Sequence, residues 1–133
     1  YGPRQRPDMA MHRLIDSAIN GSEFTMFGDG SQIRDFTYVG DIVEANLCAA
    51  TATDAVGGVF NIGGGSSATM HDVVAAVRDA AGAPPNITLG AKALGDVFRT
   101  GARIDRANQT LDWTPTVSMP EGVALQVQAA THP

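Results

Sequence analysis

One arginine stands out as a residue that could do chemistry. The stretch MFGDGSQIRDFTYVGD, positions 26–41, places Arg34 between a glycine-rich turn and an apolar run. A guanidinium presents a planar fork of N–H donors that matches a phosphate or a carboxylate. Its neighbour Asp35 is a poor partner, because adjacent residues of an extended segment point to opposite sides. Two interpretations therefore stay open: Arg34 binds an anion, or it forms a weak surface ion pair with Asp35 or Asp29.

The other basic residues give weaker signals. Arg4 and Arg6 precede an expected helix, whose first backbone N–H groups attract anions. An anion site and solvated loop charge explain this pair equally well. Arg99, Arg103 and Arg106 form a looser basic group, for which surface charge is the better interpretation.

Other catalytic patterns find little support. Ser66, Ser67, His71 and Asp72 lie close together, but Ser, Thr and Asp dominate helix starts, so helix capping explains them better than a hydrolase triad. The glycines at 63–65 fit neither phosphate-loop pattern, and we interpret them as a tight turn between a strand and a helix.

Metal and dehydrogenase chemistry are also poorly supported. The three histidines, His12, His71 and His132, are scattered along the sequence. The single cysteine, Cys48, lies in an apolar helical run, so we interpret it as a small buried hydrophobic side chain. A Tyr-x-x-x-Lys pair is absent, because a threonine stands four positions before the only lysine, Lys92.

Bulk properties set the class of protein. With 133 residues, we expect one domain over 1–133. A net charge of −5 argues against nucleic acid or an anionic membrane as partner. No apolar run approaches the roughly 20 residues that span a bilayer, and no signal-peptide pattern is present, so a cytoplasmic location is our default expectation.

Helical and strand patterns alternate along the chain, which predicts an α/β fold. Asp41 and Glu44 form a capping-box pattern with Asp41 as the N-cap residue. The patterns predict strands at 24–27, 36–39, 59–62 and 87–89. They predict helices from Pro7-Asp8 to Asn20, from Asp41 onward, from Thr69 to Gly82, over Asp105–Leu111, and from Ser118 onward.

Five motifs in order carry a family resemblance: YGPRQRPDMA, GDGSQIRDFTYVGDIVEA, FNIGGG, GDVFRT, and LDWTP followed by Glu121-Gly122. Together they resemble the C-terminal part of the extended short-chain dehydrogenase/reductase family. They look most similar to nucleotide-sugar 4-epimerases that act on UDP-glucose or UDP-glucuronate, and dTDP-glucose 4,6-dehydratases share parts of the pattern.

The resemblance implies an α/β substrate-binding portion whose N-terminal, NAD-binding Rossmann portion and Tyr-x-x-x-Lys pair lie outside this sequence. It implies that Arg34 binds the diphosphate of a UDP-sugar. The other implied positions are Met26, Phe27 and Gly28 along the uracil and ribose, with Gln32 beside them, and Tyr1, Gly2 and Pro3 near the nicotinamide of NAD.

The sequence departs from the family pattern in two places. Ala93-Leu94-Gly95-Asp96 stands where the family usually has Arg-x-Gly-Asp, so Ala93 removes a second phosphate clamp. Lys92 could substitute only as a point charge without the fork geometry. Ala102-Arg103 replaces the usual Ala-Asp pair, which shifts the expected helix start to Asp105.

Several functional interpretations stay open. The chain is the UDP-sugar-binding part of a 4-epimerase, inactive alone because it lacks the NAD loop and the Tyr-x-x-x-Lys pair, or it is part of a 4,6-dehydratase. Alternatively it is a stand-alone nucleotide-sugar-binding module, or a self-associating structural domain. Without a Rossmann portion we expect Ile42, Val43 and Leu47 to be exposed, which favours self-association into a homo-oligomer.

Overall fold

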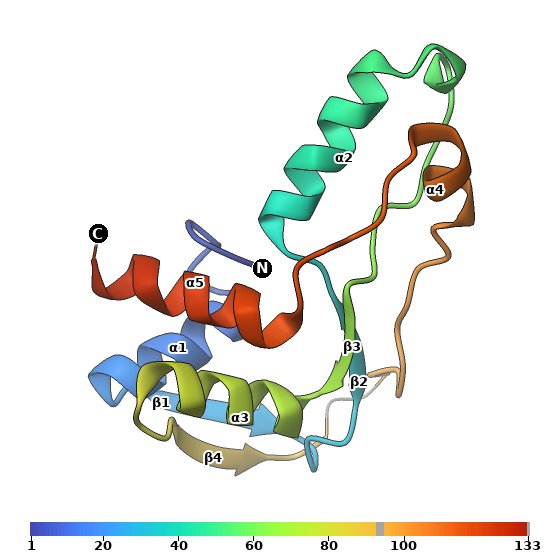
Figure 1. Cartoon of the computed structure of the whole chain (residues 1–133). Coiled ribbons are helices and arrows are strands. Elements are labelled where there is room, and N and C mark those ends of the chain that lie inside the picture. The colour runs from blue at the N-terminus through green and yellow to red at the C-terminus, as the bar shows by residue number, and fades with distance from the viewer. Residues whose placement is uncertain (93–94, 133) are drawn as a thin grey trace.

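The computed structural model describes residues 1–92 and 95–132, which form an α/β fold with two regions (Figure 1). We call the larger region the body. It contains α1 (Ala10–Asn20), β1 (Glu23–Phe27), β2 (Ile33–Phe36), β3 (Ser66–Thr69), α3 (Met70–Ala81), β4 (Asn86–Gly90) and α5 (Met119–Thr131). We call the smaller region the lobe. It contains α2 (Val39–Thr51), a short 3-10 helix (Thr53–Ala55) and α4 (Asp105–Leu111).

The body is built on a parallel pair of strands, β1 and β4, with Phe24 opposite Ile87. Residues alternate along β1, so that Phe24 and Met26 are buried while Glu23 and Phe27 are exposed. Helix α1 packs on both strands, and α3 packs between α1 and α5 (Figure 1). The side chains shared by these elements form the main core, which is centred on Leu14, Val73, Val77 and Val123.

Strands β2 and β3 form a separate antiparallel pair, with Ile33 opposite Thr69 and Phe36 opposite Ser66. The strand expected at 36–39 is therefore wrong in its position, because pairing ends at Phe36 and α2 begins at Val39. The strand expected at 59–62 is also wrong. Strand assignment requires a hydrogen-bonded neighbour, and none lies beside this apolar segment within the described part of the chain.

Helix ends mostly follow the sequence signals. Thr69 caps α3 in a reciprocal capping box with Asp72, and Ser118 caps α5, as expected. Ser66 and Ser67 belong to β3 rather than to a helix start, which corrects their interpretation as capping residues. Asp41 is not an N-cap residue either: α2 starts two residues earlier, and its N-cap residue is Tyr38.

Asp41 instead ties the lobe to the chain segment that leads into α5. Its carboxylate, which is buried, accepts hydrogen bonds from Thr116 N at 3.1 Å and Val117 N at 3.2 Å. Its backbone carbonyl accepts a bond from Trp113 Nε1 at 3.0 Å. Trp113 belongs to a small second core that also includes Ala45, Ala107 and Leu111.

The face of α2 opposite to Ala45, which belongs to the second core, is uncovered. Val39, Val43 and Leu47 recur every four residues and are all exposed, and Ile42 is half-buried. The expected exposure of Val43 and Leu47 is thus confirmed. None of the helices in the described ranges is long and apolar enough to cross a bilayer.

Candidate functional site

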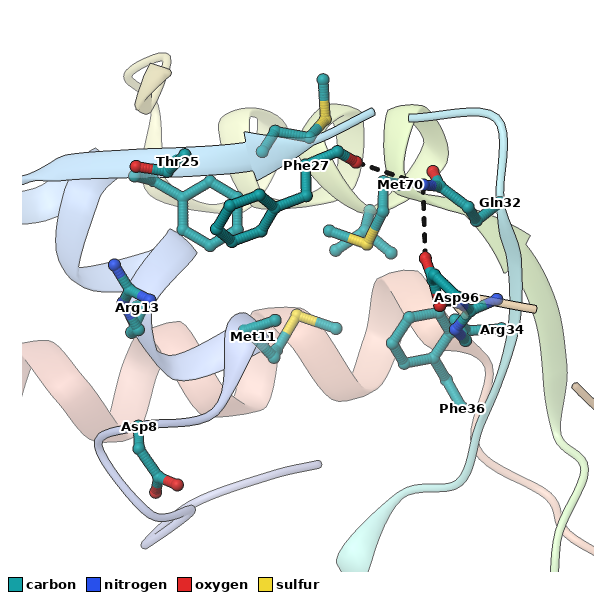
Figure 2. A pocket seen from close by; sticks show the side chains of 14 residues that line it. Asp8, Met11, Arg13, Thr25, Phe27, Gln32, Arg34, Phe36, Met70 and Asp96 are labelled. Atoms are coloured by element: carbon teal, nitrogen blue, oxygen red, sulfur yellow. Dashed lines mark hydrogen bonds and ion pairs between the residues drawn. The ribbon is translucent and has the colours of Figure 1, made fainter. Parts of the chain in front are cut away.

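A cavity of about 390 Å³ opens between α1, β1, β2 and the start of α3 (Figure 2). Its walls are mainly apolar and sulfur-rich, with Met11, Phe24, Met26 and Met70 among the lining residues. Charged and polar side chains gather at its two ends. Gln32, Arg34 and Asp96 lie at one end, and Asp8 and Arg13 lie at the other (Figure 2). The cavity can therefore hold an elongated ligand with an apolar middle and polar ends.

The uncovered edge of β1 borders this cavity. Gly28 N donates to Gly90 O at 3.0 Å, on the β4 side, whereas Phe27 O accepts from Gln32 Nε2 at 3.1 Å on the other side. Backbone groups of successive residues in a parallel strand point to alternate sides, so the Thr25 N–H and C=O also face the edge that β4 leaves uncovered. These groups offer a donor and an acceptor to a planar ligand.

Arg34 is held at the cavity end by a residue far away in the sequence. Its Nη2 forms an ion pair with the Asp96 carboxylate. Its Nη1 donates to Ile33 O at 2.9 Å and more weakly to Phe98 O at 3.5 Å. Both charged side chains remain partly open to solvent. An incoming anion can therefore reach the guanidinium and compete with Asp96.

The two acids considered as local partners have other roles. Asp35 accepts a hydrogen bond from Gly64 N at 2.9 Å, so that amide is not free for a ligand. Asp29 accepts from Ser31, whose side-chain and backbone hydrogen bonds lower the pKa of the Asp29 carboxyl. The local ion-pair interpretation of Arg34 is therefore wrong, because its partner lies 62 residues away.

Gln32 connects β1 to the Arg34 end of the cavity (Figure 2). It is 6% exposed, and besides Phe27 O its Nε2 contacts an Asp96 carboxylate oxygen at 3.4 Å. These two acceptors fix the orientation of the amide. A Cβ at position 28 would lie 2.8 Å from Gln32 Nε2 and would displace this amide, and the backbone at φ +75° also favours glycine.

The first three residues lie apart from the cavity. The Tyr1 hydroxyl donates to Ser118 O at 3.2 Å, and Gly2 N donates to Gln126 Oε1 at 2.9 Å. Burial, with smaller contributions from nearby charges, raises the pKa of Tyr1 to about 12. Pro3 lines a separate hollow between α1 and α5. A role for these residues toward NAD stays a prediction.

The remaining sequence candidates make local contacts or are not described. Arg6 pairs with the exposed Asp8 at 3.3 Å, Arg103 pairs with Asp105, and Arg106 lies over the ring of Phe60. Lys92 is exposed near the turn at Gly28. Ala93 lies outside the described residues. In the described ranges, no group of three or more His, Cys, Asp and Glu residues could hold a metal ion.

Sequence reasoning missed several residues that the fold brings to the cavity. Asp96 was noted only as part of a motif, although it pairs with Arg34. Arg13 and Met70 also line the cavity, but each lies on a helix whose sequence pattern indicates only which side is buried. No local signal could have joined these residues, because helix packing brings them together.

Comparison with known proteins identifies relatives of this chain. The family model described as "NAD dependent epimerase/dehydratase family" matches residues 1–63. In Bacillus subtilis (strain 168), the uncharacterized UDP-glucose epimerase YtcB is 38% identical over 127 residues, which cover 96% of this chain and 40% of that protein. The chain is similar to the C-terminal part of proteins of the NAD-dependent epimerase/dehydratase family.

Similar proteins of known structure share the fold. MoeE5 in complex with UDP-glucuronic acid and NAD superposes with a TM-score of 0.91 at 38% identity, covering 98% of this chain and 44% of MoeE5. The Bacillus cereus UDP-glucuronic acid 4-epimerase in complex with UDP-glucuronic acid and NAD also gives 0.91, at 36% identity and 98% and 42% coverage. The extended short-chain dehydrogenase/reductase resemblance and its α/β fold are confirmed. The chain spans about 40% of the length of the curated relatives it matches.

Proposed function

We propose that this chain is the UDP-sugar-binding part of an NAD-dependent sugar-nucleotide 4-epimerase. The observation that carries the proposal is the position of Arg34 at one end of an apolar cavity that runs along the uncovered edge of β1. Homologues of known structure bind UDP-sugars and NAD, which supports the same ligand class for the protein to which this chain belongs.

The cavity suits a nucleoside diphosphate in physical terms. A pyrimidine has apolar faces that pack against Met26 and Phe27, and a polar edge that pairs with the Thr25 and Phe27 backbone. Gly28 and Gln32 complete the wall beside it. The diphosphate then replaces Asp96 as a partner of Arg34, forming a charge-assisted, bidentate contact.

Catalysis requires groups that this chain does not contain. The sequence has no Tyr-x-x-x-Lys pair to move the proton of a sugar hydroxyl and no glycine-rich NAD loop. We therefore expect the chain alone to bind without turnover, and Tyr1, Gly2 and Pro3 to approach the nicotinamide only in a complete enzyme. The uncovered face of α2 would then pack against the NAD-binding portion.

UDP binding tests this function directly. UDP should raise the melting temperature of the chain in a concentration-dependent way, because a ligand that binds only the folded state stabilises it. NAD should give no shift. Arg34→Ala should weaken UDP binding by about 10- to 100-fold through loss of the charge-assisted hydrogen bonds.

The matched control is Arg78→Ala, which removes an exposed arginine on α3 that pairs with its neighbour Asp79. This variant should retain the full UDP shift. An absent UDP shift in the unaltered chain, or an equal shift in Arg34→Ala, would contradict the proposal.

A further inference from the structure

A second arginine lies at the opposite end of the cavity from Arg34 (Figure 2). Arg13 projects from the first turns of α1, and its Cζ lies 5.7 Å from the centre of the Phe24 ring. Phe24 is 4% exposed, so the ring provides a fixed surface. A cation over an aromatic face is held there by the ring quadrupole, which orients the guanidinium at this end of the cavity.

The donors of Arg13 are not taken up by a carboxylate. Across residues 1–92 and 95–132, no ion pair involves Arg13. Asp8, the acid at the same end of the cavity, pairs with Arg6 at 3.3 Å. A guanidinium carries five N–H donors and no acceptor, so Arg13 can serve only a ligand atom that accepts hydrogen bonds.

The two arginines have different positions along the ligand. Apolar side chains, including Met11, Phe27 and Met70, line the cavity between them (Figure 2). If Arg34 holds the diphosphate, as the proposed function requires, the nucleoside extends along β1 toward Arg13. The group that meets Arg13 is then an edge of the base and not a phosphate.

We propose that Arg13 is a specificity-determining residue that donates to a base carbonyl and so selects oxo-pyrimidines over aminopyrimidines. Uracil and thymine carry a carbonyl acceptor at position 4, whereas cytosine carries an amino group that only donates. If an Arg13 N–H faces the amino group of cytosine, two donors meet and neither forms a hydrogen bond. A site built to donate to a carbonyl therefore discriminates strongly against a ligand that lacks this carbonyl. This inference rests on the proposed function.

Calorimetric titration of the chain with UDP, dTDP and CDP tests the selection. The unaltered chain should bind UDP and dTDP more tightly than CDP. Arg13→Ala should weaken UDP and dTDP binding about tenfold and leave CDP binding within about twofold, so that the preference collapses. Arg13→Lys, which keeps a donor without the fork, should retain part of the preference.

The outcomes separate this inference from the function on which it rests. If the unaltered chain binds none of the three diphosphates, the proposed function fails and this inference fails with it. If Arg13→Ala weakens all three equally, Arg13 acts as a charge toward phosphate, and only the selection is overturned. Unchanged affinities in Arg13→Ala overturn it as well. Arg78→Ala should behave like the unaltered chain, which excludes a general effect of lost charge.

Discussion

The body and the lobe bury their apolar side chains to very different extents. In the body, α1, α3 and α5 surround a core whose central residues Leu14, Val77 and Val123 are fully buried. In the lobe, four buried residues form the whole second core of the described chain, and α2 leaves Val43 and Leu47 exposed on its other face. The body therefore contains its own stabilising contacts, whereas the lobe has a face suited to a further partner.

The two regions also correspond to two parts of the proposed function: ligand binding in the body, and packing against an NAD-binding portion through the lobe. The cavity lies entirely in the body, between elements that pack on the main core. We therefore propose that this chain alone retains ligand binding. Packing against an NAD-binding portion would involve the lobe, and we propose that exposure of α2 makes the isolated chain associate with itself.

The largest expected effect is a loss of stability in the body. Leu14→Ala removes a fully buried side chain and leaves a cavity in the body core, which should lower the free energy of unfolding by about 3 kcal/mol. Denaturant titration measures it. Leu89→Ala, at a position 73% exposed, should change the free energy by less than about 0.5 kcal/mol. Equal effects of the two changes would contradict the description of the body core.

A smaller and more local effect is expected in the lobe. Asp41→Asn replaces a carboxylate oxygen that accepts backbone N–H bonds with an amide that donates, which should cost about 1–3 kcal/mol. Hydrogen exchange should accelerate in α2 and α4 and remain slow in α1 and α3. Asp54→Asn, on the exposed 3-10 helix, is the control. Uniform acceleration across both regions would show that the two do not open separately.

The smallest expected effect on stability accompanies a change in association. Val43→Lys combined with Leu47→Glu places charges on the uncovered face of α2 without touching either core. We expect sedimentation to shift from oligomer to monomer at micromolar concentration, with little change in unfolding. Leu89→Lys, on β4 in the body, should leave the association unchanged. A purely monomeric unaltered chain would refute self-association.

Local sequence signals were sufficient to locate α1, α3, α4 and α5 and the strands β1 and β4, but not β2, β3 or the start of α2. Thr69 with Asp72 and Ser118 with Pro120 mark helix starts because the side chains satisfy backbone groups close in sequence. The prediction of Asp41 as a helix cap failed, because its carboxylate accepts hydrogen bonds from backbone groups 75 and 76 residues away and not from its own helix. The prediction of a strand at 59–62 also failed, because no neighbouring strand of the described chain forms backbone hydrogen bonds with this apolar segment.

The site likewise combines features that local sequence indicates with features that depend on distant parts of the chain. The type of Arg34 and the turn before it left anion binding and a local ion pair equally open, and the anion-binding role that the family resemblance implies stays a prediction. Its ion pair with Asp96 and the placement of Arg13 at the other cavity end depend on tertiary packing. The family resemblance supplied the nucleotide interpretation, because five ordered motifs carry more information than the periodicity of any single element.

The path of the chain has a consequence for how these regions could have arisen and can be separated. The polypeptide crosses between body and lobe four times, before α2, before β3, before α4 and before α5 (Figure 1). Neither region is a continuous stretch of sequence, so replacing one continuous gene segment cannot exchange either region as a whole. A protease that cuts one crossing would nick the protein without releasing a piece, and the halves would stay together through their cores.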